Sequence, residues 1–145
     1  MNIRNARPED APRLAEISGV ALGYPSAPED TRRRLIEVSA KPEHFLRVAE
    51  DERGEAVGFI HACAYDTLYY DPVKYVMALA VDPAWQGKGV GKVLLTACEE
   101  WARAEGATGV RLFSGSDRQG AHAFYMRMGY TVRKESKSFW KNLSE

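Results

Sequence analysis

The residues best suited to chemistry form a glycine-rich turn at residues 86–92, Gln-Gly-Lys-Gly-Val-Gly-Lys. The turn follows an apolar run, predicted as a strand, and precedes an amphipathic stretch, predicted as a helix. A helix N-terminus leaves about four backbone N–H groups unpaired and carries partial positive charge. Glycines let this backbone approach an anion closely, and Lys88 and Lys92 add charge, so the segment can hold a phosphate or diphosphate. A tight strand-to-helix turn without a ligand is the alternative interpretation.

Two familiar phosphate-binding loops do not fit this turn. A nucleoside triphosphate P-loop needs Ser or Thr after Gly-Lys, whereas Val93 follows Gly91 and Lys92 here. The dinucleotide fingerprint needs G-x-G-x-x-G early in a βαβ unit, whereas this chain has G-x-G-x-G past its middle.

Tyr125 is a second candidate, on a short helix predicted over 121–128. Ala121, Phe124, Tyr125 and Met128 recur at i, i+3, i+4 and i+7, a stripe that by itself indicates core packing. A tyrosine with a pKa of about 10 also stays protonated near neutral pH and can donate a proton to a leaving group. Spacing alone leaves both interpretations open.

The composition is that of one ordinary folded domain. The chain has 145 residues, of which 45% are hydrophobic and 28% charged, and these values exclude a disordered chain. Because 20 Lys and Arg balance 20 Asp and Glu, no general affinity for nucleic acid or an anionic membrane is expected. The apolar runs are shorter than a membrane span of about 20 residues, and the N-terminus has no signal-peptide pattern. Cys63 and Cys98 form no disulfide framework or metal site. We therefore expect a soluble, cytoplasmic protein.

A mixed α/β sheet must position these candidates. Strands are predicted over 3–6, 45–49, 56–65, 75–81 and 109–114, with a closing hairpin from 130–132 and 138–140. Helices are predicted to begin near Pro8 and near Pro28, and two more are expected over about 90–105 and 121–128. The run 75–81 is apolar at every position, which predicts a central strand buried on both faces. The long helix should pack through one stripe, consisting of Val90, Val93, Leu94, Ala97, Cys98 and Trp101.

With its elements in this order, the chain resembles the GNAT superfamily of acyl-CoA-dependent N-acetyltransferases. The strand 77–81, the stop at Asp82-Pro83 and Gln86-x-x-Gly89-x-Gly91 match the central signature of that superfamily. A later helix with a Phe-Tyr pair, ending in Gly-Tyr, stands at 121–130, and the opening residues 3–10 are also typical. The resemblance implies one N-acetyltransferase domain over 1–145. Its fold would be α/β (α+β): a twisted, mixed, mostly antiparallel sheet of six to seven strands, splayed at the central strands and flanked by about four helices.

The resemblance also implies the reaction and its residues. The acetyl group of acetyl-CoA would pass to a primary amine of a small molecule or peptide by direct attack in a ternary complex, without a metal. Tyr125 would be the general acid, the strand backbone would hold the pantetheine arm, and the glycine turn would hold the pyrophosphate. The implied acetyl-CoA-binding residues are Leu79, Ala80, Val81, Gln86, Gly87, Lys88, Gly89, Val90, Gly91, Lys92 and Arg118.

Two departures from the superfamily pattern bear on function. Arg118 stands where many members have Asn, and residues 75–78 hold no carboxylate where many members place the general base. The base is therefore not identified, and His61 and His122 are weak candidates. A catalytically idle CoA-binding regulatory module is the alternative function, and an enzyme that binds nucleoside triphosphates is a third.

The sequence gives weaker signals for the residues that bind the acceptor and for the identity of the acceptor. Tyr24, Asp66, Tyr69 and Asp71 fall in loops that line the acceptor in relatives, and we predict that they bind substrate. Their charge and aromatic character favour a small cationic amine, while polyamines, aminoglycoside-like compounds, amino acids and peptide amines all stay open. Members of the superfamily often dimerise, so a homodimer is one expectation.

Overall fold

The computed structural model describes residues 1–144 in two compact units, Met1–Phe113 and a second unit that begins at Ser114. The first unit contains one mixed five-stranded sheet, in the order β1-β2-β3-β4-β5. The first four strands are antiparallel to their neighbours, and β5 runs parallel to β4. The strands are β1 (Asn2–Asn5), β2 (His44–Glu50), β3 (Ala56–Tyr65), β4 (Val73–Val81) and β5 (Val110–Leu112).

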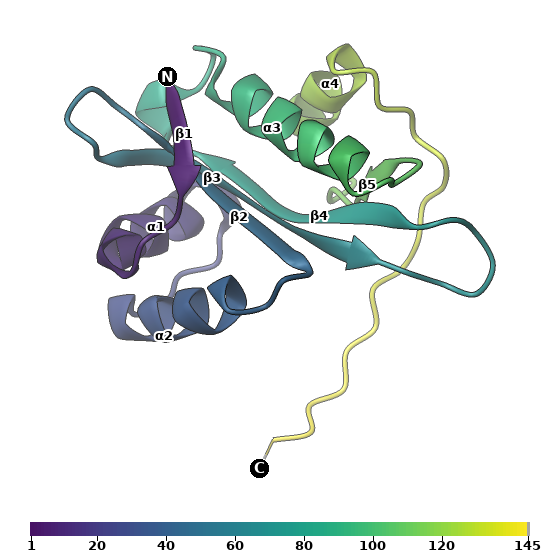
Figure 1. Ribbon diagram of the computed structural model, residues 1–145, viewed down its shortest axis with the longest axis horizontal. Helices are drawn as coiled ribbons and strands as arrows, with labels where there is room; N and C mark the ends of the chain where they lie inside the picture. Colours follow the sequence, from purple (N-terminus) through teal and green to yellow (C-terminus); the bar gives the residue numbers. More distant parts are fainter. Residues whose placement is uncertain (145) are drawn as a thin grey trace. The chain divides into compact units, whose positions relative to one another are not determined.

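Helices cover both faces of this sheet. α1 (Ala11–Ile17) and α2 (Pro28–Ser39) lie on one face, and α3 (Val90–Ala104) lies on the other (Figure 1). A π-helical turn, η2 (Ser18–Leu22), extends α1 until Gly23 ends it with a left-handed φ of 76°. These elements confirm the predicted helices of the first unit, with shifts of a few residues at their ends.

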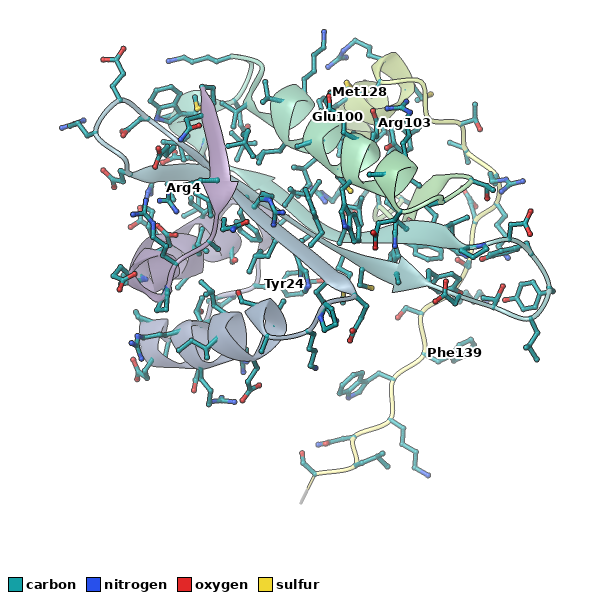
Figure 2. All side chains as sticks on the ribbon, viewed as in Figure 1. Arg4, Tyr24, Glu100, Arg103, Met128 and Phe139 are labelled. Atoms are coloured by element: carbon teal, nitrogen blue, oxygen red, sulfur yellow. The ribbon has the colours of Figure 1, made fainter. Side chains whose placement is uncertain are left out.

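The α1 face of the sheet is the apolar core of the first unit. Leu14 and Ile17 of α1 pack there against Val48, Phe59 and Ala80 of the strands. A bidentate ion pair joins β1 to the start of α1, because Arg4 donates from Nη1 and Nη2 to the two carboxylate oxygens of Asp10, 2.8 Å away in each case (Figure 2). This pair fixes the first helical segment beside the edge of the sheet.

The other face is covered by α3, whose predicted stripe is confirmed except at one position. The ring of Phe45 on β2 stacks on Trp101 of α3, with centroids 4.8 Å apart. Val93, placed on the stripe from the sequence, is 39% exposed, and Leu95 is fully buried instead. The buried face of the helix is therefore rotated from the predicted stripe, away from Val93 and toward Leu95. Glu100 and Arg103 occupy the outer face of α3 (Figure 2).

The prediction that β4 is buried at every position was wrong. The side chain of Met77, in the middle of the strand, is 48% exposed. The reason is that β5 pairs with β4 only over Lys74–Val76, so that the rest of β4 has a strand neighbour on one side alone within the described residues.

The second unit contains α4 (Gln119–Arg127), which confirms the predicted short helix. The predicted closing hairpin over 130–132 and 138–140 is wrong: residues 130–144 contain no strand, so the described sheet has five strands instead of six to seven. Each predicted strand is only about three residues long, and a charged run at 133–137 separates them. Phe139 and Trp140 are both 89% exposed (Figure 2). Within residues 1–144, no helix has the length and apolar character needed to cross a membrane.

Candidate active site

The unpaired edge of β4 is the first component of the site. β3 pairs with β4 along its whole length, and the N–H of Asp82 donates to the carbonyl of Val57 on that side, 2.8 Å away. Backbone groups alternate in direction along a strand, so those of Leu79 and Val81 point away from β3. β5 ends its pairing at Val76, so no described strand pairs with this edge, and apart from the carbonyl of Val81, which accepts from the side chain of Gln86, it can pair with an extended, amide-containing ligand.

A β-bulge lies where β5 leaves β4. The register between β3 and β4 passes from His61–Ala78 to Ala62–Val76, so Met77 is an extra residue without a partner on β3. A bulge bends its strand and increases the local twist, and bulges are frequent beside active sites. The expected splay at the central strands therefore has a local cause in the backbone of Met77.

The glycine turn follows the end of β4 after Asp82 and a short 3-10 helix, η3 (Pro83–Trp85). Gly87 and Gly89 have φ values of 77° and 85°, in the left-handed region where other residues are strained. A Cβ at either position would meet no atom within 4 Å, so these glycines are required by their backbone conformation and not by lack of space. Gly89 is the N-cap of α3 and gives it no side-chain cap, so the first N–H groups of the helix face outward.

Charge at the turn is positive. Lys88 and Lys92 are both exposed, and the ammonium of Lys88 lies 5.2 Å from the ring centroid of Trp85. The side-chain amide of Gln86 donates to the carbonyl of Val81, 3.1 Å away, which ties the turn back to the end of β4. The backbone donors, the helix dipole and two ammonium groups together suit a diphosphate.

An ion pair that sequence reasoning missed holds this turn in place. Asp82 accepts from the N–H of Ala84 at 2.9 Å and is paired with the guanidinium of Arg13 on α1. The Nε of Arg13 also donates to the carbonyl of Ala56, 2.9 Å away. The Ala84 N–H and the Arg13 guanidinium lower the pKa of Asp82, so it is charged at neutral pH. No local pattern relates residues 13 and 82, and only the fold brings them together.

Tyr125 lies on α4 in the second unit. Its ring makes edge contacts with those of Phe124 and Tyr130, with centroids 5.2 and 6.0 Å apart. Burial raises the pKa of its phenol, an effect that nearby Arg118 opposes. The hydroxyl is therefore protonated at neutral pH, as a general acid must be. Arg118 is the exposed N-cap residue of the same helix.

The predicted acceptor residues are exposed and lie on separate loops. Tyr24 follows η2 and is 74% exposed, while Asp66, Tyr69 and Asp71 belong to the loop between β3 and β4. Across the described residues, no hydrogen bond or ring contact joins Tyr24 to that loop. The ring of Tyr69 packs edge-on against Tyr70, with centroids 5.0 Å apart, and is 76% exposed.

An arginine occupies the aromatic cluster beside this loop. The guanidinium of Arg111, on β5, lies 4.5 Å from the ring centroid of Tyr65 and 5.0 Å from that of Phe113, and it donates to the hydroxyl of Tyr70. These ring faces are therefore already engaged by a cation of the chain. Tyr69 is the ring of this group most open to a ligand.

A histidine pair is the second feature that sequence reasoning missed. Nδ1 of His44 on β2 and Nε2 of His61 on β3 are 2.8 Å apart and share a hydrogen bond. Burial, followed by the neighbouring His44, lowers the pKa of His61 to about 4. The correct register of the predicted hairpin would have revealed this pair.

His122, the third histidine, instead makes a 2.8 Å hydrogen bond with the carbonyl of Gly115. Residues 1–144 contain no cluster of three His, Cys, Asp or Glu side chains suited to a metal ion.

Comparisons with known proteins agree with this geometry. Residues 8–130 match the acetyltransferase (GNAT) family. The chain is 31% identical over 136 residues to aminoglycoside N(6′)-acetyltransferase type 1 of Stenotrophomonas maltophilia, covering 88% of this chain and 84% of that protein. It is also 31% identical to a mycothiol acetyltransferase of Propionibacterium freudenreichii, of which it spans 43% while 91% of this chain is covered. A putative acetyltransferase from Agrobacterium tumefaciens has the same fold, with a TM-score of 0.85 at 23% identity over 97% of this chain and 100% of that one. The chain belongs to the acetyltransferase (GNAT) family.

Proposed function

We propose that this chain moves the acetyl group of acetyl-CoA to a primary amine of a small, cationic acceptor by direct attack within a ternary complex. The observation that carries the proposal is the continuity of two binding elements. The free edge of β4 at Leu79 and Val81 is followed, after Asp82 and a short 3-10 helix (η3, Pro83–Trp85), by the left-handed turn at Gly87 and Gly89. One extended molecule that carries amides at one end and a diphosphate at the other fits such a surface.

Acetyl-CoA supplies an acyl group already activated as a thioester. The N–H of Val81, whose carbonyl accepts from Gln86, and the backbone of Leu79 would pair with the two amides of its pantetheine arm, and residues 86–92 would hold its diphosphate. The second amide lies only a short carbon chain from the sulfur, so this alignment brings the thioester toward the bulge at Met77. The exposed Arg118 would add a positive group for a phosphate or the pantetheine region.

Tyr125 would act as the general acid, giving its proton to the thiolate as the C–S bond breaks. The raised pKa of its phenol supports this role, since the hydroxyl stays protonated until it is used. The role also requires both units to act together, and we propose that residues 1–145 form one N-acetyltransferase domain.

The acceptor class follows from the loop between β3 and β4 and from the relatives. Asp66 and Asp71 are exposed carboxylates, and the open ring of Tyr69 can contact a cation. Two relatives are named for an aminoglycoside and for mycothiol, which are small molecules. We propose a small polar amine as the acceptor, with these three side chains and Tyr24 among its contacts.

The binding step is tested by replacing Gly89 with Ala. A residue with a Cβ in the left-handed region costs about 1–2 kcal/mol, and relief of this strain would rotate the N-terminal peptide groups of α3. We expect the CoA dissociation constant, measured by calorimetry, to rise at least tenfold, about 1.4 kcal/mol. Gly106→Ala is the matched control, because Gly106 has a φ of 77° and open space but lies beyond the other end of α3. Equal CoA affinity in the two variants would remove the turn from the site.

The competing function is a CoA-binding module without catalysis. It is favoured by the lack of a carboxylate at residues 75–78 of β4. The two functions separate in one assay: thiol release from acetyl-CoA with and without a panel of aminoglycosides, polyamines and amino sugars. Release that depends on an amine supports the enzyme, whereas tight CoA binding with no release supports the module. The family assignment gives no support to an enzyme that binds nucleoside triphosphates.

A further inference from the structure

The histidine pair on the sheet has no role in the function described so far. His44 and His61 are half-buried on neighbouring strands, and their ring centroids are 5.1 Å apart. The hydrogen bond between them joins Nδ1 of His44 to Nε2 of His61, so one ring nitrogen of each residue is left for another partner. Two imidazoles joined in this way can pass a proton from one end of the pair to the other.

The sheet register places the pair on the α1 face. Leu46 is directly opposite His61, and Leu46 packs against the apolar core beneath α1. Residues directly opposite each other share a face, as do residues two apart on one strand, so His44 and His61 both lie on that face. On its other side His61 is opposite Ala78, the residue next to the bulge at Met77.

This position suits the acceptor amine. Neighbouring strands are about 4.8 Å apart, so the imidazole of His61 lies one strand away from the part of β4 that the thioester would reach. Ala78 has only a methyl group on this face, where it packs against the apolar core, so an amine nitrogen or one water would reach His61 from the side of the bulge at Met77. Residues 75–78 offer no carboxylate, so β4 itself provides no competing base.

The remaining groups near the pair do not take over this role. Cys63, two residues further along β3, has a thiol whose pKa is raised, chiefly by burial and also by Glu43, so it is protonated at neutral pH. Glu43 precedes β2, and no described hydrogen bond joins it to either imidazole. β4 presents Ala78 opposite His61, and the residues beneath α1 on this face, Leu46 among them, are apolar.

We propose that His61 is the general base of the acetyl transfer and that His44 is the positioning residue that carries the proton on to solvent; this rests on the proposed function above. The free Nδ1 of His61 takes the proton of the amine as the C–N bond forms and the C–S bond breaks. The proton on Nε2 of His61 passes to Nδ1 of His44, and Nε2 of His44 releases one to water. The departing thiolate takes its proton from Tyr125, so each side of the reaction is balanced.

Kinetics of three variants test the proposal. His61→Ala should lower kcat about 10²-fold while the dissociation constant of CoA stays unchanged. Added imidazole should restore part of the rate in this variant, and the loss should shrink for an acceptor amine of low pKa, which needs less help to lose its proton. His44→Ala should give a smaller loss in kcat. His122→Ala tests the other histidine named as a candidate base: its ring hydrogen-bonds the carbonyl of Gly115 in the second unit, and its loss in kcat should be smaller than that of His61→Ala.

A titration followed by NMR supplies a readout without any ligand. Since His61 has a pKa of about 4, its ring should stay neutral at pH 5 in the wild-type protein. His44→Ala removes the neighbouring ring that helps to lower the pKa of His61 and opens the site to water, so the pKa of His61 should rise toward 6.5 in that variant. The acid limb of kcat/KM should then move to higher pH, because the base must be neutral to act.

The outcomes separate this inference from the proposed function. If the wild-type protein binds CoA but no amine causes thiol release, both ideas fail. If release is normal but His61→Ala keeps its rate, or loses it without rescue by imidazole and with equal losses for all amines, the base is elsewhere and only this inference is overturned.

Discussion

Replacing Gly58 with Ala tests how closely the glycine turn at residues 86–92 depends on the packing of α3. Gly58 lies on β3 beneath α3, and a Cβ there would be 3.0 Å from the carbonyl oxygen of Ala80, 3.1 Å from Cγ1 of Val90 and 3.2 Å from Cδ1 of Leu94. The first contact is with backbone, and both side chains are almost completely buried. None of the three atoms can move without displacing α3 or spreading the strands.

The cost can be worked from these contacts. Overpacking a well-packed core by a methyl group costs about 1–3 kcal/mol. For a chain of this size, each 1 kcal/mol lowers Tm by roughly 3–4 °C, so Tm should fall by about 3–12 °C. Val90 is the first residue of α3, so its displacement should also move the N–H groups at Gly89 and weaken CoA binding.

Thermal unfolding and CoA calorimetry measure the two effects together. Gly109→Ala is the matched control, because the nearest atom to its new Cβ is Cγ1 of Val73 at 3.8 Å, an ordinary contact. If Gly58→Ala melts within about 1 °C of the control and binds CoA equally well, the reasoning from α3 packing to the turn is refuted.

Three further predictions concern Tyr125, the ion pair of Asp82 with Arg13, and Cys98. Tyr125→Phe should leave Tm and CoA affinity nearly unchanged and lower kcat at least tenfold, measured by amine-dependent thiol release; an unchanged rate across a pH series removes it as the acid. Asp82 has a lowered pKa, so its stabilising contribution is complete above about pH 4 and is lost as pH falls through the folded pKa. Asp82→Asn should remove that part of the acid dependence of unfolding, and Arg13→Ala should reduce it without removing it, because the N–H of Ala84 still lowers the pKa of Asp82. Burial raises the pKa of the Cys98 thiol to about 12, so it should react with a thiol reagent only after unfolding; modification of Cys98 in the native protein at pH 8 contradicts its burial.

The glycine turn and the elements on either side of it could be predicted because the signals for them are local. Pro83 cannot continue a strand, the glycines at 87 and 89 adopt left-handed angles that other residues avoid, and the amphipathic pattern after them marks a helix. Each of these constraints acts over a few residues, and the sequence shows all of them. The family signature is built from the same residues.

The parts that could not be predicted depend on distant contacts. The pairing of Arg13 with Asp82 joins residues far apart in the chain, and the bond between His44 and His61 depends on strand register. The bulge at Met77 was hidden because an apolar run has no alternation to interrupt. The closing hairpin failed for the opposite reason: short apolar stretches predicted strands, but residues 130–144 form no strand in the structure.

The bulge at Met77 also divides β4 into two parts with different strand neighbours. Residues 74–76, before it, pair with β5, and residues 78–81, after it, pair with β3 alone among the described strands. A one-residue slip normally reverses every side chain of a strand, but an irregular residue between the halves can absorb such a change. If the loop at 66–71 binds the acceptor as proposed, insertions or deletions there could change substrate choice over evolution while the end of β4 that leads to residues 86–92 keeps its register.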